Sequence, residues 1–108
     1  MNQLHGTILI IADNRLVAED LQLLLTSPGL SVMTAASSKE ALGVIAAYSP
    51  NIIIMDMELY EKRDGAGTAP DVLRNLPIPV VFIADHVDRA RLQKAGIKSV
   101  VTIHDLIF

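Results

Sequence analysis

An uninterrupted apolar run that ends in a carboxylate constrains this chain more than any other feature of its sequence. Ile52 to Met55 are all apolar, and Asp56 follows them directly. A strand with one wet face alternates apolar and polar residues, so this run predicts a strand buried on both faces, as in parallel sheets. Such sheets bind ligands at the carboxyl ends of their strands. Asp also starts loops and caps turns, so Asp56 alone does not separate a site from a turn.

The same pattern recurs twice. Ile8 to Ala12 is a second apolar run followed by Asp13, and Val80 to Ala84 is a third, followed by Asp85. Helical segments separate the strands, and a fifth strand is expected over Ser99–Ile103. Alternating strands and helices predict one α/β domain over residues 1–108, with a doubly wound parallel sheet and right-handed crossovers.

The first helix has clear start and stop signals. Asn14 can cap its N-terminus, and Ser27-Pro28-Gly29 stops it. The spacing of its side chains predicts one apolar face, while Arg15, Glu19 and Gln22 are expected to point outward. The residues predicted to form that apolar face are Leu16, Val17, Leu21, Leu24 and Leu25.

The remaining elements are shorter or less regular. Leu30–Ala35 has mixed polarity, which favours a strand at the edge of the sheet. Ser37 and Glu40 form a capping box, which predicts a helix over about Ser38–Tyr48. The last two expected helices cover Asp71–Leu76, after Pro70, and Val87–Ala95, before Gly96.

Composition excludes several classes of function. The chain has 108 residues, no cysteine and a net charge of −3, so disulfides, thiolate metal sites and a charge-driven nucleic-acid interface are not expected. No apolar run is long enough to span a bilayer, and the polar N-terminus lacks the features of a signal peptide. We therefore expect a cytoplasmic protein without a direct membrane or nucleic-acid partner. The sequence also has neither a hydrolase arrangement nor the glycine-rich turn of a dinucleotide fold, so we do not expect an enzyme.

Two of the strand-end carboxylates are expected to meet. In a flavodoxin-like sheet of order 2-1-3-4-5, the first and third strands are neighbours, so Asp13 and Asp56 would share one crevice. Two adjacent carboxylates repel each other unless a cation lies between them. Ligands that are all oxygen favour Mg²⁺, and the backbone carbonyl of Glu58 could be a third ligand.

At this point the sequence resembles the receiver domain of two-component response regulators. The matching stretches are Ile8–Asn14, Ile52–Leu59 and Pro79–Ala84, and the resemblance covers nearly the whole chain. From Met57 through Asp64-Gly65 to Pro79 the chain looks most like receivers attached to PAS-type sensor histidine kinases. The resemblance implies that Asp56 accepts a phosphoryl group from the phosphohistidine of a kinase or phosphotransfer domain. It also implies that Asp13, Asp56 and the Glu58 carbonyl hold Mg²⁺.

Three positions depart from the family pattern. Ala12 stands where the family has the first of two acids, and Ala84 stands where it has Thr or Ser. The family lysine of the fifth strand falls on Thr102 or Ile103, and Lys98 is at the wrong end of that strand. A lysine contact of this kind contributes roughly 1.5–3 kcal/mol where it is desolvated. The site is therefore expected to bind metal weakly and to lack the usual hydroxyl that reports phosphorylation.

Two functions stay open. The first is a phosphoacceptor receiver with an atypical site, and the second is a pseudo-receiver that mediates protein interaction or dimerisation without phosphorylation. The C-terminus bears on the choice, because only His104–Phe108 follow the last strand, where receivers normally form a fifth helix. A short or missing fifth helix would leave apolar surface uncovered, which favours a partner or a homodimer.

Overall fold

The structure, a computed structural model, describes residues 6–56, 76–84 and 100–102, and these form five strands and two helices. In chain order the elements are β1 (Gly6–Ile11), α1 (Arg15–Leu25), β2 (Leu30–Ala35), α2 (Ser38–Tyr48), β3 (Ile52–Asp56), β4 (Val80–Ala84) and β5 (Val100–Thr102).

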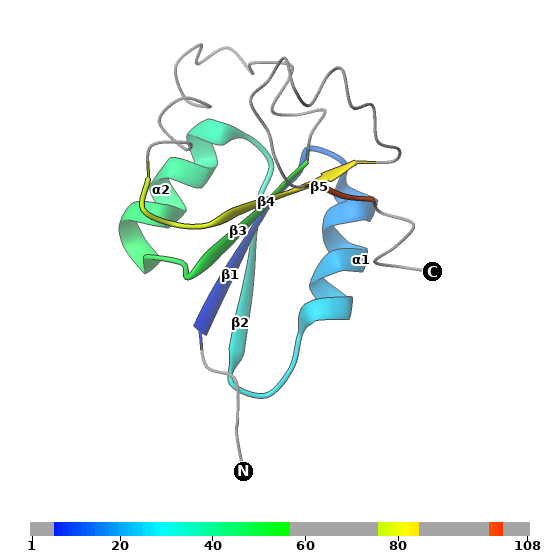
Figure 1. Cartoon of the computed structure of the whole chain (residues 1–108), viewed down its shortest axis with the longest axis horizontal. Coiled ribbons are helices and arrows are strands. Elements are labelled where there is room, and N and C mark those ends of the chain that lie inside the picture. Colours follow the sequence, from blue (N-terminus) through cyan, green and yellow to red (C-terminus); the bar gives the residue numbers. More distant parts are fainter. Residues whose placement is uncertain (1–5, 57–75, 85–99, 103–108) are drawn as a thin grey trace.

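The strands form one parallel sheet of order β2-β1-β3-β4-β5, with β3 in the middle (Figure 1). The predicted fold class and strand order are confirmed, and β2 is an edge strand as its mixed polarity indicated. Helices α1 and α2 lie on opposite faces of the sheet, as a doubly wound fold requires (Figure 1).

The continuous apolar runs are buried on both faces because each face of the sheet has its own core. Alternate residues of β1 and β3 point to opposite faces. On the α1 face, Ile10 and Ile54 pack with Leu21. On the α2 face, Leu9 and Ile53 pack with Ala41. A strand that contributes to both cores has no wet face, which explains why its sequence does not alternate.

Helix α1 begins and ends as predicted, but its buried face is narrower than predicted. Ala18 and Leu21 are buried, whereas Leu16 and Leu24 are 71% and 51% exposed, so placing these two leucines on the inner face was wrong. The sheet covers only one stripe of the helix, and the leucines of α1 are spread around more of its circumference than that stripe.

Gln22 is a second correction on α1. Its side chain is partly buried, and its amide Nε2 donates to the backbone carbonyl of Val32 at 2.9 Å. The helical pattern placed it outward because glutamine is polar. The side chain instead reaches from α1 to the edge strand β2.

Helix α2 has the predicted bounds and the predicted N-terminal signal. The Ser37 hydroxyl accepts from the Glu40 backbone N–H at 3.1 Å, and Glu40 Oε2 accepts from the Ala36 N–H at 3.2 Å. The Ser37 contact satisfies a donor in the first turn of the helix. The Glu40 carboxylate reaches back to the residue before the cap, one position earlier than the Ser37 N–H that a capping box uses. At the other end, Ser49 has a left-handed backbone (φ 46°), which ends the helix before Pro50.

Strand boundaries differ from the predicted ones by one or two residues. β1 starts at Gly6 rather than Ile8, because Gly6 already pairs with Leu30. β3 includes Asp56 as its last residue, whereas the sequence placed the carboxylate after the strand.

Several predictions fall outside the described residues. These are the helix over Val87–Ala95, the helix over Asp71–Leu76 apart from Leu76, which lies in an irregular segment, and the state of the fifth helix. Within the described ranges, neither helix has the length and hydropathy needed to cross a membrane.

Candidate functional site

The carboxyl ends of β1 and β3 lie side by side at one edge of the sheet. Ile10 pairs with Ile54 and Ile11 pairs with Met55, so the next position in this register sets Ala12 beside Asp56. Asp13 follows one residue later. The predicted meeting of the first and third strands is therefore present in the backbone, and both aspartates belong to adjacent chain segments at this edge.

Asp56 is a buried carboxyl group, with 8% of its surface exposed. It ends the central strand and lies on the same face as Ile54, two residues earlier. Burying an ionised carboxylate is costly unless hydrogen bonds or a cation compensate it. The structure therefore places Asp56 at the buried end of a strand and not in a turn.

Asp13 has a different environment. It is exposed and lies between the end of β1 and the start of α1. The cap of α1 is the next residue, because Asn14 Oδ1 accepts from the N–H groups of Leu16 at 3.0 Å and Val17 at 3.2 Å. Capping of α1 therefore does not explain why the chain has an acid at position 13.

Ala12 directly follows β1, at the point where the family pattern has an acid. It is 3% exposed, its N–H donates to the Ala35 carbonyl at 3.0 Å, and it packs in the core on the α1 face. Continuing the register of β1 and β3 by one position sets Ala12 beside Asp56. Asp56 therefore has a methyl group beside it where the pattern would give a second negative charge.

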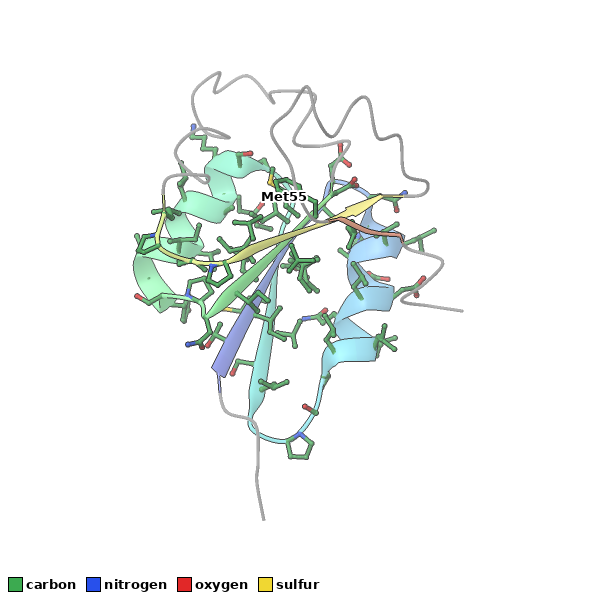
Figure 2. The ribbon with its side chains drawn as sticks, in the orientation of Figure 1. Met55 is labelled. Atoms are coloured by element: carbon green, nitrogen blue, oxygen red, sulfur yellow. The ribbon has the colours of Figure 1, made fainter. Side chains whose placement is uncertain are left out.

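Met55, the residue before Asp56, points to the opposite face of the sheet from Asp56. Its side chain, labelled in Figure 2, is 1% exposed and belongs to the core on the α2 face. Because neighbouring strand residues point to opposite faces, Met55 fixes which face Asp56 takes. A shift of β3 by one residue would bury the carboxylate among Leu9, Ile11 and Ala41, so the register is strongly specified.

The other predicted site positions lie on β4, on β5 or outside the described residues. Ala84 ends β4 and pairs in register with Thr102, the last residue of β5. Neither residue can supply the cation that the family pattern has in this region. Glu58 and Ile103 are outside the described ranges.

The two aspartates suit a hard cation in their chemistry. Among the described residues, no cluster of three or more His, Asp or Glu side chains could hold a metal ion. Mg²⁺ nevertheless binds proteins through one or two carboxylates, with water and phosphate oxygens completing its octahedron. The donor set of Asp13 and Asp56 therefore fits Mg²⁺.

Sequence reasoning missed one residue that holds this edge in register from the opposite end of the strands. Asn51 Oδ1 accepts from the Thr7 N–H at 2.8 Å, and the Asn51 N–H donates to the Thr7 carbonyl at 2.8 Å. The pair fastens the start of β3 to the start of β1. The available signal was an asparagine placed directly before the apolar run.

Comparisons with known proteins agree with this geometry. The model of the response regulator receiver domain family matches residues 8–102. The phyllosphere-induced regulator PhyR of Methylorubrum extorquens is 33% identical over 84 residues, which cover 76% of this chain and 32% of that protein. The chain therefore spans about a third of the length of this curated relative.

Solved structures are similar over most of the chain. A response regulator from Chloroflexus aurantiacus J-10-fl has a TM-score of 0.73 and 27% identity, over 96% of this chain and 93% of that chain. The anti-anti-sigma factor PhyR from Bartonella quintana has a TM-score of 0.70 and 29% identity, over 94% of this chain and 42% of that chain. Taken with the strand order and the aspartate at the end of β3, these matches establish that the chain belongs to the response regulator receiver domain family, with a degenerate site.

Proposed function

We propose that the chain is a signalling receiver that accepts a phosphoryl group on Asp56. The observation that carries the proposal is the buried carboxyl group of Asp56 at the carboxyl end of the central strand, beside the segment that bears Asp13. Helices cover both faces of the sheet, so this edge is where a ligand of the fold binds.

The chemistry needs few groups. A carboxylate oxygen of Asp56 attacks the phosphorus of a phosphohistidine, the P–N bond breaks, and the histidine nitrogen keeps the bonding electrons. Mg²⁺ held by Asp13, Asp56 and the Glu58 backbone carbonyl would neutralise the phosphoryl oxygens during the transfer. The donor is accordingly a histidine kinase or a phosphotransfer domain, and the expected location is the cytoplasm.

The departures from the family pattern in the site predict weaker Mg²⁺ binding and fewer contacts to the phosphoryl group. With Ala12 in place of an acid, the metal has one negative charge fewer near it, so Mg²⁺ affinity is reduced. With Ala84 in place of a hydroxyl residue and no lysine at the end of β5, the phosphoryl group loses two contacts. We expect slow phosphorylation and a weak conformational response.

A second candidate function is an interaction module that works without phosphorylation. Two observations favour it. The three substitutions remove groups that hold and report the phosphoryl group, and α1 exposes Leu16, Leu23 and Leu24 at 71%, 78% and 51%. Exposed apolar side chains that gather on one element suit a protein partner. The similar protein from Bartonella quintana is named an anti-anti-sigma factor.

One experiment separates the two candidates. The 108-residue chain is incubated with Mg²⁺ and acetyl phosphate, and intact mass is followed over time. The first function predicts a phosphate increment that is lost in Asp56→Asn and slowed in Asp13→Asn. Asp20→Asn, which removes an exposed acid from α1, is the matched control and should keep the increment.

Two results would count against the first function. One is the absence of any increment together with no Mg²⁺ binding by calorimetry. The other is an increment that persists in Asp56→Asn, since the phosphoryl group would then be on another residue. The first result leaves the interaction module as the better assignment, whereas the second leaves a phosphoacceptor and removes only the assignment of Asp56.

A further inference from the structure

The pairing of the edge strand β2 with β1 shows which backbone groups of β2 point away from the sheet. Gly6 N–H donates to the Gly29 carbonyl at 3.1 Å, and Ala12 N–H donates to the Ala35 carbonyl at 3.0 Å. Continuing this parallel pattern through the register, Ser31 and Met33 also point their backbone groups at β1. The N–H and C=O groups of Leu30, Val32 and Thr34 therefore point away from the sheet.

Two of these outward groups are bonded within the chain. The Leu30 N–H donates to the Ser27 carbonyl at 3.0 Å, which closes the turn before β2. The Val32 carbonyl, at the middle of the strand, accepts from Gln22 Nε2 at 2.9 Å. This contact is partly buried, so water competes with it less than at an open surface.

The sequence of β2 itself contains none of the features that usually prevent an edge strand from pairing with another strand. Proteins commonly protect an edge strand with a charged side chain, a proline or a bulge. Leu30–Ala35 reads Leu-Ser-Val-Met-Thr-Ala and contains no charge and no proline, and its register with β1 is continuous. Protection of this edge therefore depends on a residue outside the strand.

We propose that the outer edge of β2 is a strand-pairing surface for a second copy of this chain, and that Gln22 keeps it closed. The second copy is the occupant because the edge is self-complementary: two antiparallel β2 strands centred on Val32 exchange the Val32 N–H and C=O groups across a two-fold axis. While Gln22 Nε2 bonds the Val32 carbonyl, the side chain holds one of the two acceptor positions of that oxygen and competes with the central exchange. The inference does not depend on the chemistry of Asp56.

Gln22→Met is the direct test, because methionine has nearly the shape of glutamine but cannot donate to the Val32 carbonyl. Self-association is measured by sedimentation equilibrium on the full 108-residue chain. We expect the wild type to show no β2-mediated dimer and Gln22→Met to associate at least about tenfold more tightly. Amide hydrogen exchange should slow at Val32 and Thr34 as the concentration of the variant rises.

Asp20→Met is the matched control. It adds the same apolar side chain to α1 at an exposed position. If Asp20→Met associates as strongly as Gln22→Met, added hydrophobic surface explains the effect and the proposal fails.

Proline substitutions identify the surface that pairs. In the Gln22→Met background, Val32→Pro removes an outward N–H that β1 does not use, so the chain should stay folded and return to monomer. Met33→Pro removes an N–H directed at β1 and should destabilise the fold.

Three results would overturn the proposal. In the first, Gln22→Met stays as monomeric as the wild type, with unchanged exchange at Val32 and Thr34. In the second, the double variant with Val32→Pro folds and still dimerises. In the third, the wild type already dimerises through β2. The exchange measurement decides the question even if the double variant does not fold.

Discussion

Ala12 is the residue whose replacement tests the site most directly, because it sits beside Asp56 in the register of β1 and β3. An acid at position 12 would bring a second negative charge to a carboxyl group that is already buried. Without metal the two carboxylates repel each other, and with Mg²⁺ they attract a shared cation.

We therefore expect Ala12→Asp to lose about 1–2 kcal/mol of unfolding free energy in metal-free buffer. The same variant should bind Mg²⁺ about tenfold more tightly than the wild type. Urea denaturation with and without Mg²⁺ measures the first effect, and calorimetry measures the second. Ala12→Asn, which has similar size and no charge, should show neither the metal dependence nor the tighter binding. Equal Mg²⁺ affinity in Ala12→Asp and wild type would mean that the metal does not bind near position 12.

Gly6 is the second residue with a specific prediction. Its φ of +153° is one that L side chains rarely adopt, and a Cβ there would lie 2.7 Å from Asn51 Oδ1. That oxygen also accepts the Thr7 N–H, so a methyl group would disturb the contact that fastens β3 to β1.

Gly6→Ala should destabilise the chain by roughly 1–3 kcal/mol, measured by urea or thermal unfolding. Gly43→Ala is the control, since this helical glycine has open space around the position of a Cβ. That substitution should stabilise by about 0.5–1 kcal/mol because alanine favours the helix. If Gly6→Ala and Gly43→Ala changed the unfolding free energy in the same direction, the close approach of Asn51 would not explain the effect of Gly6→Ala.

At the scale of elements, α1 shows where sequence periodicity succeeds and where it stops. The cap at Asn14 and the end before Ser27 came from local signals and are confirmed. The choice of buried side chains was right for Val17, Leu21 and Leu25, which belong to the core or pack against it. It was wrong for Leu16 and Leu24, which are exposed, and it omitted Ala18, which is buried. A leucine-rich helix offers more than one apolar stripe, and only the position of the sheet decides which stripe is covered.

The two kinds of leucine on α1 should differ in their contribution to stability. Leu21 is 0% exposed and packs with Ile10 and Ile54, so Leu21→Ala should cost about 2–5 kcal/mol. Leu23 is 78% exposed, so Leu23→Ala should change the unfolding free energy by no more than about 0.5 kcal/mol. Chemical denaturation of both variants checks this. A large loss in Leu23→Ala would show that the side chain is covered in solution.

At the scale of the whole molecule, the sequence predicted the fold better than the site. The buried strands and the edge position of β2 followed from which apolar runs were continuous and which were mixed, whereas the strand order was that of the flavodoxin-like fold. The first two depend on burial, which acts on whole segments. Gln22 and Asn51 were not predicted, because each role depends on one polar atom meeting one backbone group from a distant segment.

The chemistry of Asp56 is also not fixed by the fold. The strand order brings positions 12, 13 and 56 together whatever side chains they carry. Ala12 and Ala84 keep the architecture and alter the donor set, so receivers with and without phosphotransfer can share one backbone.

The central position of β3 in the sheet should make the strand that ends in Asp56 slow to open. The strand is bonded to β1 on one side and β4 on the other, and both of its faces are buried. Amide protons of Ile54 and Met55 should therefore exchange only through global unfolding, with the urea dependence of the whole chain. Exchange through small local openings would contradict this. The carboxylate is thus attached to a strand that we expect to open only with the whole fold. We therefore expect regulation to act through the groups that surround the carboxyl edge and not through fraying of β3.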